Sequence, residues 1–416
     1  MKPSFRISEQ RLLTRVRELG TIGVDAPQGL VRVAATDADK AGRDQVVAWM
    51  RGAGLEIVID RIGNIFGIWQ TAENEDEEPV MVGSHIDTVI NAGIYDGCYG
   101  VISGVEVIQT LIEAGFQPAR PIVVAAFTNE EGIRYQPDMM GSLVYAGGLS
   151  VEEALATVGT DGSILGEELE RIGYAGEAEP GFMKPSAYVE LHVEQGPVLA
   201  SLEIPIGAVE NLQGISWQRL TIEGVANHAG TTPISMRKDA GLAAARIITF
   251  LRALADSSGG STVATVGTIE FEPNAINVIP SRAVLTVDLR DADEEKLRQA
   301  EKRLTEYLEE LEDTAGVTIA AERLVRFAPV SFDENIVGMI EAAAEKRGLP
   351  ARRMTSGAGH DAQMMARICP AAMIFVPSVA GISHNPQEYT READLIAGAN
   401  VLLDVVVALS EAWQKS

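Results

Sequence analysis

The sequence predicts an α/β protein with a mixed, largely parallel sheet that is interrupted by an inserted α+β domain. Short apolar runs alternate with helical patterns in residues 1–214 and again in residues 330–416. Continuous apolar strands between helices are typical of a sheet covered on both faces. Residues 215–329 instead follow the order strand, helix, strand, strand, helix, strand, which is the ferredoxin-like order. We therefore expect one domain in two parts, 1–214 and 330–416, and a second domain at 215–329.

The expected elements can be placed along the chain. Ser8 is a plausible N-cap for an N-terminal amphipathic helix. Buried strands are expected at residues 55–60, 79–83, 121–127, 187–191 and 372–376, and helices at 37–51, 100–114 and 360–366. In the insert, strands are expected at 217–223, 262–271, 283–289 and 317–326, with helices at 238–255 and 293–314.

Composition excludes several classes of function. The net charge of −25 over 416 residues argues against a nucleic-acid partner, which usually requires a basic face. We find no run of about eighteen apolar residues and no apolar signal-peptide core at the N-terminus, so we expect no membrane partner. Cys98 and Cys369 do not form a disulfide framework, which favours a cytoplasmic protein with reduced thiols. An anionic substrate would need a local cationic clamp.

The first chemical signal is the placing of the five histidines beside glycines or acidic residues. In Gly83-Ser84-His85-Ile86-Asp87, the histidine follows an apolar run. Residues two apart on an extended backbone share a face, so Asp87 could accept the second N–H of a metal-bound His85 imidazole. Alone, this short motif is more often a polar strand end that faces solvent.

Carboxylates supply the second signal. Asp96 lies in a glycine-rich turn, where one carboxylate can reach two metal ions, although a tight Asp-Gly turn is the simpler interpretation. Glu130 and Glu131 are adjacent after another apolar run, where they repel each other and are costly to desolvate. A dinuclear site would resolve this conflict, with one glutamate on a metal and the other free as a general base. An exposed loop pair is the alternative.

The remaining candidates complete a set of metal ligands. His192 ends an expected strand before a Gly-Pro stop, and His384 follows the last one. The set combines nitrogen and carboxylate donors without cysteine, which suits zinc, manganese, nickel or cobalt. It consists of His85, Asp96, Glu131, His192 and His384. Four of the five lie at or just beyond the carboxyl ends of expected strands, where open α/β sheets place their sites. We predict a metal site there.

Longer motifs resemble the hydantoinase/carbamoylase branch of the zinc aminoacylase and carboxypeptidase superfamily. They span nearly the whole chain and read GSHIDTV, YDG, TNEEG, MMGS, LHVEQGPVL, GVANHAGTTP, NVIPS, DLRDAD, SGAGHDA and SHNPQEYT. The run ELHVEQGPVL followed by NHAGTTP is specific to this branch. This branch includes N-carbamoyl-L-amino acid hydrolases, allantoate amidohydrolases and β-ureidopropionases. The resemblance implies a metallopeptidase-like catalytic domain and an inserted lid and dimerisation domain.

The resemblance also implies roles for single residues. Two divalent ions would be held, one by His85, Asp96 and His192 and the other by Asp96, Glu131 and His384, with Asp96 bridging. Glu130 would be the general base, with Asp87 in the same catalytic set. His228 would polarise the scissile carbonyl.

Substrate-binding residues are implied in the same way. Asn277 and Arg290 would grip a substrate carboxylate, Gln195 would lie near the substrate, and residues 357–360, including Gly359 and His360, would line the pocket. A guanidinium fork suits a carboxylate. The residues alone leave alternatives open. Arg290 between two aspartates is as well explained by a surface salt bridge, His228 by an exposed loop, and His360 by a helix cap.

The resulting hypothesis is a metal-dependent amidohydrolase that acts on a small ureido acid. An N-carbamoyl-L-amino acid would give the amino acid, ammonia and carbon dioxide. Allantoate or β-ureidopropionate would suit the same clamp and metals. From another class, a catalytically silent dimeric binding protein is disfavoured because the ligands and Glu130 are all present. The resemblance implies a homodimer through the insert, with His228 reaching the neighbour's metal site.

Overall fold

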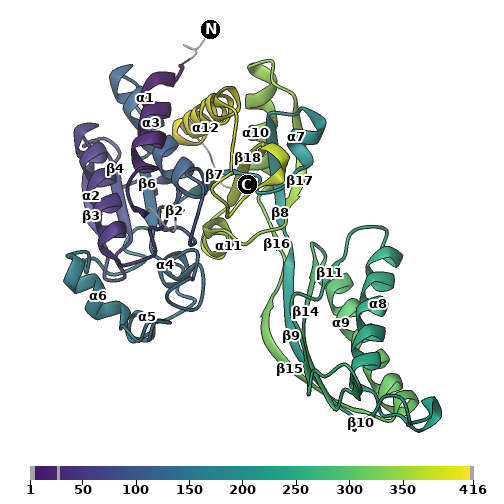
Figure 1. Cartoon of the computed structure of the whole chain (residues 1–416). Helices are drawn as coiled ribbons and strands as arrows, with labels where there is room; N and C mark the ends of the chain where they lie inside the picture. Colours follow the sequence, from purple (N-terminus) through teal and green to yellow (C-terminus); the bar gives the residue numbers. More distant parts are fainter. Residues whose placement is uncertain (1–4, 26–28, 413–416) are drawn as a thin grey trace. The chain divides into compact units, whose positions relative to one another are not determined.

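The computed structural model describes residues 5–25 and 29–412 and divides the chain into two compact units (Figure 1). Unit 1 comprises Met1–Glu210 and Phe332–Ser416, and unit 2 comprises Asn211–Ser331. The sequence-based boundaries of the insert were residues 215 and 329. Both units carry predicted site residues, so each is described in turn.

Unit 1 is built on a mixed sheet in the order β3-β4-β6-β5-β7-β18-β8, with β17 pairing to β8. The four central strands, β6, β5, β7 and β18, are parallel, and the strands that flank them are antiparallel. The strands are β3 Glu56–Ile59, β4 Ile65–Trp69, β5 Val80–His85, β6 Ile122–Phe127, β7 Ala187–Val193, β8 Ile206–Leu212, β17 Ala351–Ser356 and β18 Ala371–Val376. A short pair, β1 Val24–Asp25 and β2 Gly29–Leu30, lies apart from this sheet.

Helices cover both faces of this sheet (Figure 1). On one face lie α2 Asp37–Gly52, α3 Cys98–Glu113, α10 Glu334–Lys346 and α12 Glu392–Ala412, with α1 Glu9–Leu19 outside α3 and α12. On the other lie α4 Met140–Tyr145 and α11 Asp361–Met365. Shorter elements are α5 Val151–Leu155, α6 Leu165–Ile172, α7 Val198–Leu202 and the 3-10 turn η2 Val379–Gly381. Ser8 caps α1 as predicted, because its side chain accepts the N–H of Arg11.

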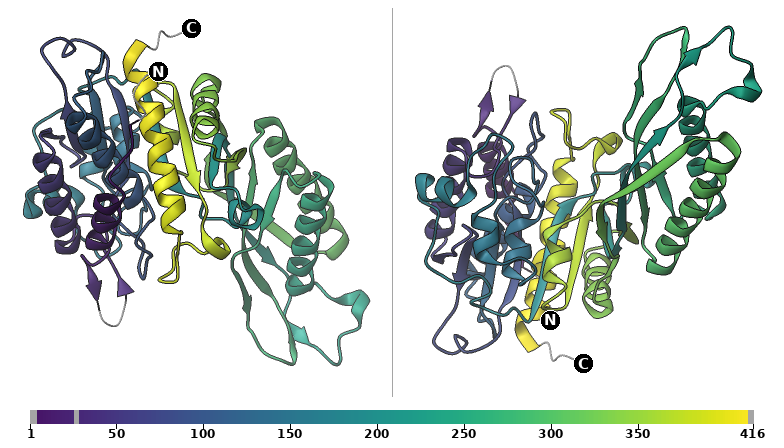
Figure 2. Two further views of the ribbon diagram at one scale, coloured as in Figure 1. Left: turned by 90° about the horizontal axis from the view of Figure 1, so that it is seen from above. Right: turned by 90° about the horizontal axis from the view of Figure 1, so that it is seen from below.

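Helix α12 is long and apolar enough to cross a membrane by length and composition alone. It contacts β18, β7 and β5, and 72% of its most apolar window is buried within the protein (Figure 2). A helix that is apolar on most sides is also what the centre of a large domain requires. The packing of α12 is therefore that of a core helix.

The strand predictions were right in the centre of this sheet and wrong at its edge. Residues 55–60 were expected to form a buried strand, but β3 is the edge strand and is partly exposed. The buried neighbour is β4, which the sequence analysis missed because Gly67 divides its apolar residues into two short pieces. Strand β8 was also missed, since its second half contains polar residues.

Unit 2 has the ferredoxin-like arrangement that its element order predicted. Its antiparallel sheet has the order β11-β14-β9-β15, with β12 also paired to β14. The strands are β9 Gly214–Glu223, β11 Val263–Thr265, β12 Ile269–Glu272, β14 Arg282–Asp291 and β15 Thr318–Phe327. Helices α8 Ala240–Ser257 and α9 Glu294–Ala315 cover one face and pack on alternate apolar strand residues (Figure 2).

Smaller elements complete unit 2. Beyond the Arg282 end of β14 lies the strand pair β10 Asn227–His228 and β13 Val278–Ile279, followed by the 3-10 turn η1 Ile234–Met236. At the other end, β16 Val330–Ser331 pairs with residues 211–212 of β8. The single strand predicted at 262–271 was wrong in detail, because the chain breaks between β11 and β12 around Gly267.

Candidate metal centre and active site

Unit 1 brings the five predicted metal ligands together at the carboxyl ends of its parallel strands. His85 is the last residue of β5, and His192 lies one residue before the end of β7. Glu131 follows β6, Asp96 lies just before α3, and His384 lies between β18 and α12. Parallel strands present their carboxyl ends at one edge, so loops far apart in sequence converge there.

The carboxylate of Asp96 lies between two groups of side chains. Its Oδ1 atom is 3.1 Å from Nε2 of His192 and 3.6 Å from Nε2 of His85. Its Oδ2 atom is 3.2 Å from Nε2 of His384, which is in turn 3.6 Å from Oε2 of Glu131. In each group, His85–Asp96–His192 and Asp96–Glu131–His384, the candidate ligand atoms all lie within 4.8 Å of one another. Asp96 is thus the shared member of two potential metal positions.

The orientation of the inner histidines fits metal ligands. Nδ1 of His85 lies 3.0 Å from the backbone oxygen of Asp87, and Nδ1 of His192 lies 2.8 Å from that of Val193. A carbonyl can only accept, so each Nδ1 donates its proton there, and Nε2, which faces Asp96, is the nitrogen that a metal ion would bind. Imidazole nitrogens and carboxylate oxygens gathered at this range are stabilised by a bound cation. The nitrogen and oxygen donors suit a divalent metal ion.

Asp87 orients the site differently from the sequence interpretation. Strand β5 ends at His85, and Nδ1 of His85 bonds to the Asp87 backbone carbonyl at 3.0 Å, while Oδ1 of the Asp87 carboxylate lies 3.9 Å from the same nitrogen. The carboxylate oxygens accept the backbone N–H groups of Glu130 and Glu131, both at 3.2 Å. Asp87 therefore fixes the turn that carries the two glutamates.

The adjacent glutamates point at different histidines. Oε2 of Glu130 lies 3.3 Å from Nε2 of His85, whereas Glu131 faces His384. Burial strongly raises the pKa of the Glu130 carboxyl, despite the opposing effect of His85. Burial and repulsion from Asp96 raise the pKa of Glu131 to about 8. Burial would also raise the pKa of Asp96, but hydrogen bonds from His192, His384 and His85 hold it well below its usual value. Burial therefore disfavours the charged form of both glutamates, a cost that a bound cation would offset.

Two supporting residues escaped the sequence analysis. Glu388 accepts the N–H groups of Tyr95 at 3.1 Å and Asp96 at 3.4 Å, and accepts the hydroxyl of Ser383 at 2.8 Å. It thereby ties the Asp96 turn to the His384 loop. Gly97 has φ +62°, and a Cβ there would lie 2.4 Å from the His85 ring. Only the position of Glu388 inside the SHNPQEYT motif could have signalled its role.

Gln195 lies directly beside the second group. Its Nε2 atom is 2.8 Å from Oδ2 of Asp96 and 3.3 Å from Nε2 of His384. Its backbone has φ +57° and donates its N–H to the hydroxyl of Ser378 at 3.0 Å. The expectation that Gln195 lies at the site therefore agrees with its contacts.

His360 is buried next to the inner histidines. Its ring centroid lies 4.5 Å from that of His192, and its Nε2 lies 3.1 Å from the hydroxyl of Ser356. It occupies the N-cap position of α11, but its side chain makes no capping hydrogen bond. Burial holds the pKa of His360 well below its usual value, so it is neutral. The neighbouring Gly359 leaves room for Met139, whose Cε would lie 3.0 Å from a Cβ at this position.

Unit 2 carries the other three candidates, and it places one of them, Arg290, apart from His228 and Asn277. His228 is exposed on β10, where its Nδ1 accepts the N–H groups of Gly230 at 3.0 Å and Thr231 at 3.3 Å. Asn277 lies beside it, since its carbonyl accepts the N–H of Ala229 at 2.9 Å. Arg290 lies at the other end of β14 and pairs with Asp288 at 2.9 Å.

The separation within unit 2 is large. Arg290 is eight residues after Arg282 along β14, and a strand rises roughly 3.3 Å per residue, which gives about 26 Å. His228 and Asn277 belong to the pair of strands beyond Arg282. Within unit 2, Asn277 and Arg290 are therefore not brought together as one carboxylate clamp.

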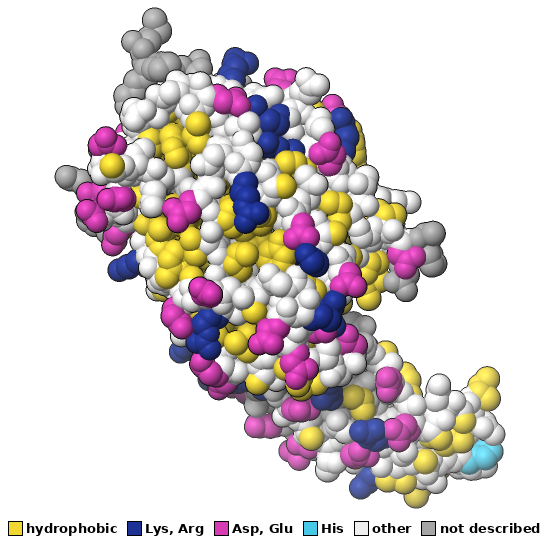
Figure 3. Space-filling model, turned by 90° about the vertical axis from the view of Figure 1, so that its left-hand side faces the viewer, with side chains coloured by type: hydrophobic (Ala, Val, Ile, Leu, Met, Phe, Trp, Pro, Cys, Tyr) yellow, Lys and Arg dark blue, Asp and Glu magenta, His cyan; other side chains and the backbone are white. Residues whose placement is uncertain are grey.

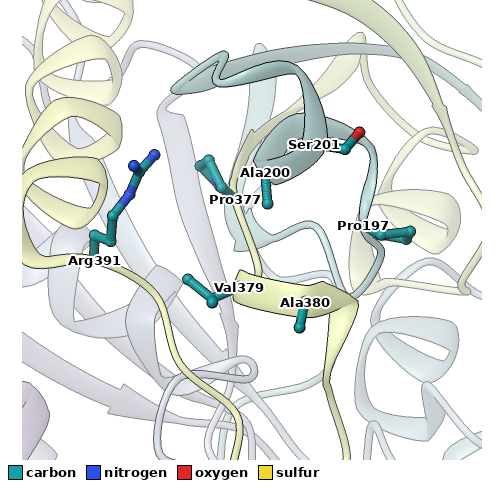
Figure 4. A pocket seen from close by; sticks show the side chains of 7 residues that line it. All are labelled: Pro197, Ala200, Ser201, Pro377, Val379, Ala380 and Arg391. Atoms are coloured by element: carbon teal, nitrogen blue, oxygen red, sulfur yellow. The ribbon is translucent and has the colours of Figure 1, made fainter.

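A cavity of about 380 Å³ flanks the loops of the centre (Figure 4). It is lined by Pro197, Ala200, Ser201, Pro377, Val379, Ala380 and Arg391. Its walls include segments that adjoin Gln195 and Ser378, but none of the candidate ligands. On the face shown in Figure 3, acidic and basic side chains are interspersed rather than gathered into one basic stripe. Cys98 and Cys369 are buried thiols.

The fold and the cluster define a hydrolase of a metal-dependent class, and comparison identifies its family. Residues 81–408 match the peptidase family M20/M25/M40, and the chain belongs to this family. It is 39% identical over 406 residues to an N-carbamoyl-L-amino-acid amidohydrolase of Rhizobium meliloti, covering 98% of this chain and 97% of that one. It is also 36% identical to a ureidoglycolate hydrolase of Arabidopsis thaliana, and this match covers 98% of this chain and 88% of that one.

A solved structure agrees with these relatives. An amidase of the hydantoinase/carbamoylase family from Burkholderia multivorans superimposes with a TM-score of 0.95 at 40% identity, and the match covers 98% of this chain and 99% of that one. The predicted fold class and the predicted family are thus confirmed.

Proposed function

We propose that the protein hydrolyses the carbamoyl group of an N-carbamoyl-L-amino acid to give the amino acid, ammonia and carbon dioxide. The observation that carries this proposal is the Asp96 carboxylate, whose two oxygens face separate histidine groups beside Glu130. The similarity to a carbamoyl-amino-acid amidohydrolase over 98% of the chain supports the substrate class.

The metal ligands are assigned from the two groups. His85, Asp96 and His192 would hold an inner divalent ion, and Asp96, Glu131 and His384 an outer one. Zinc, manganese, nickel and cobalt all suit these donors. When bound, such ions supply Lewis acidity and lower the pKa of the attacking water.

The protein side chains would move the protons and hold the substrate. Glu130 takes a proton from the attacking water and passes it to the leaving nitrogen, and Asp87 keeps the Glu130 turn in place through its backbone hydrogen bonds. His228 stabilises the negative charge that develops on the carbonyl oxygen. Gln195, Gly359 and His360 line the substrate pocket.

The clamp for the substrate carboxylate requires a second subunit in this proposal. Asn277 and Arg290 lie at opposite ends of the unit 2 sheet, so a clamp made from both would take one residue from each of two subunits. Large apolar side chains are exposed next to His228 and Asn277: Val225, Ile234, Met236 and Ile276. Exposed apolar side chains of this kind are typical of an interface. We propose a homodimer through unit 2, with His228 and Asn277 acting on the neighbour's site, in a cytoplasmic enzyme.

A second candidate substrate is another ureido acid, namely ureidoglycolate or allantoate. The ureidoglycolate hydrolase of Arabidopsis thaliana supports it, since its similarity covers 98% of this chain. These substrates carry the same two features, a ureido group and a carboxylate, and would use the same residues.

The deciding experiment is a substrate panel with metal reconstitution. Chelator-treated protein is supplied with zinc, manganese, nickel or cobalt, and ammonia release is measured from N-carbamoyl-L-amino acids, β-ureidopropionate, allantoate and ureidoglycolate. We expect the highest kcat/KM on an N-carbamoyl-L-amino acid. A higher kcat/KM on allantoate or ureidoglycolate would reassign the substrate, and ammonia release from none of them would overturn the proposal.

A further inference from the structure

The two metal groups differ in their access to water. In the inner group, the His85 and His192 side chains are only 1% exposed. In the outer group, the His384 side chain is 50% exposed and lies in a loop. The inner position is therefore enclosed by strand ends, and the outer position borders solvent.

Gln195 contacts the outer group alone. Its Nε2 approaches Oδ2 of Asp96 and Nε2 of His384, the two atoms that an outer metal ion would use. The inner histidines face the other Asp96 oxygen, Oδ1. The Asp96 oxygen can only accept, so the amide presents its NH₂ group rather than its oxygen to the outer group.

The position of Gln195 is fixed by its surroundings. Its backbone N–H is held by Ser378, and its φ of +57° places it in a sharp turn before Gly196. Its Oε1 atom is buried with no hydrogen-bond partner among the described residues. The NH₂ group therefore stays on the outer ligands through its hydrogen bond to Asp96.

We propose that the Gln195 amide competes with the outer metal ion for Asp96 and His384. The amide nitrogen lies against the two atoms that an outer ion would use, and it has no lone pair of its own to offer a metal. The side chain must turn away before an ion binds, which weakens the outer position and leaves the inner one untouched. Gln195 thereby makes the outer ion the exchangeable one. This inference rests on the proposed metal ligands, not on the substrate.

The test is a titration of chelator-treated protein with Co²⁺, followed by calorimetry and by visible absorption. In the wild type we expect two binding steps. Gln195→Met keeps the length of the side chain but removes the donor, and Gln195→Ala removes it without adding apolar bulk. Because a hydrogen bond to a charged group is lost, the outer step should tighten about tenfold in both variants, with the inner step unchanged.

Two controls assign the steps. His384→Ala should leave one Co²⁺ step, and adding Gln195→Met to it should not change that step. Gln109→Met removes an amide that likewise donates to a carboxylate, Glu113 at 2.9 Å, and should change neither step. An outer step that is unchanged or weaker in both Gln195 variants would overturn the competition. Failure of the wild type to bind Co²⁺ would refute the metal centre itself, whatever the substrate panel shows.

Discussion

Unit 1 and unit 2 hold their functional residues in opposite ways. In unit 1, side chains from distant loops, buried ones such as His192 and the half-exposed His384, converge within hydrogen-bonding distance of Asp96. In unit 2, His228 and Asn277 are exposed at one end of the sheet and Arg290 lies at the other. The metal ligands are assembled within one unit, whereas the residues proposed to meet a substrate lie apart in unit 2 and would be completed by a second subunit in the proposed dimer.

The largest effect should come from the residue shared by both metal positions. Asp96→Asn removes one negative charge and turns one of the two oxygens into an amide donor, so both metal ions should be lost together with all measurable activity. Metal content after gel filtration is the measurement. Asp44→Asn is the matched control, because its carboxylate pairs with Lys40 and belongs to neither metal group, so this variant should retain both ions. Retention of both ions by Asp96→Asn would contradict the shared role.

The next effect concerns the division of labour between the adjacent glutamates. Glu130→Gln should keep both metal ions and reduce kcat by about 10²–10⁴-fold, the range of general acid–base catalysis. Glu131→Gln should instead weaken the outer ion. Single-turnover kinetics combined with metal analysis separates the two outcomes. If Glu130→Gln loses an ion while Glu131→Gln keeps both, the roles are reversed, since Glu130 also lies within reach of His85.

The centre of unit 1 was predictable because its chemistry depends on residue types at strand ends. Histidine or carboxylate after an apolar run is visible in a sequence, and β5, β6, β7 and β18 deliver these residues to one edge. Asp87 shows where the sequence was insufficient. Its presence was visible, but which of its atoms bonds to His85 depends on the residue at which β5 ends.

Other features depend on contacts between segments that are distant in sequence. Glu388 lies nearly 300 residues after Asp96, and no pattern near either residue encodes their hydrogen bond. The exposed edge position of β3 depends on strand order, which apolar runs alone do not specify. In unit 2, the strand pattern predicted the fold, but the distance between Asn277 and Arg290 follows from the register and length of β14.

A smaller loss is expected from His228, and it tests whether unit 2 acts across subunits. His228→Ala should lower kcat about 10²–10³-fold, because one stabiliser of the developing oxyanion is removed. His228→Asn retains an acceptor for the Gly230 and Thr231 N–H groups and controls for the turn. It should be as inactive as His228→Ala if the ring acts on the substrate.

The decisive form of this test mixes inactive subunits. The Glu130→Gln variant and the His228→Ala variant are mixed so that their subunits exchange. Each variant carries a different affinity tag, and the two tags verify the mixed dimers. The His228→Ala subunit still has Glu130 and would receive His228 from its partner, so one site of each mixed dimer should be whole. Ammonia release should return in verified mixed dimers. If they stay as inactive as the parents, His228 does not act across the interface.

The smallest effect should be that of Arg290, the residue with the strongest structural alternative. It pairs with Asp288 at 2.9 Å on β14, and both side chains are partly exposed. Partly exposed pairs of this kind contribute about 0–1 kcal/mol to stability, so Arg290→Leu should leave unit 2 folded. If the guanidinium binds the substrate carboxylate, its removal should raise KM about 10–100-fold with little change in kcat.

A matched variant and a neutral substrate separate these two roles of Arg290. Arg282→Leu removes a guanidinium from the other end of the same strand, where it pairs with Glu223 and Glu272, and should leave KM unchanged. A ureido substrate whose carboxylate is replaced by a neutral amide should be almost indifferent to Arg290→Leu, since it offers no charge to the guanidinium. Equal losses on the charged and neutral substrates would mean that Arg290 only supports Asp288. A loss confined to the charged one would mean that unit 2 contributes the cation that a protein of net charge −25 needs to hold an anion.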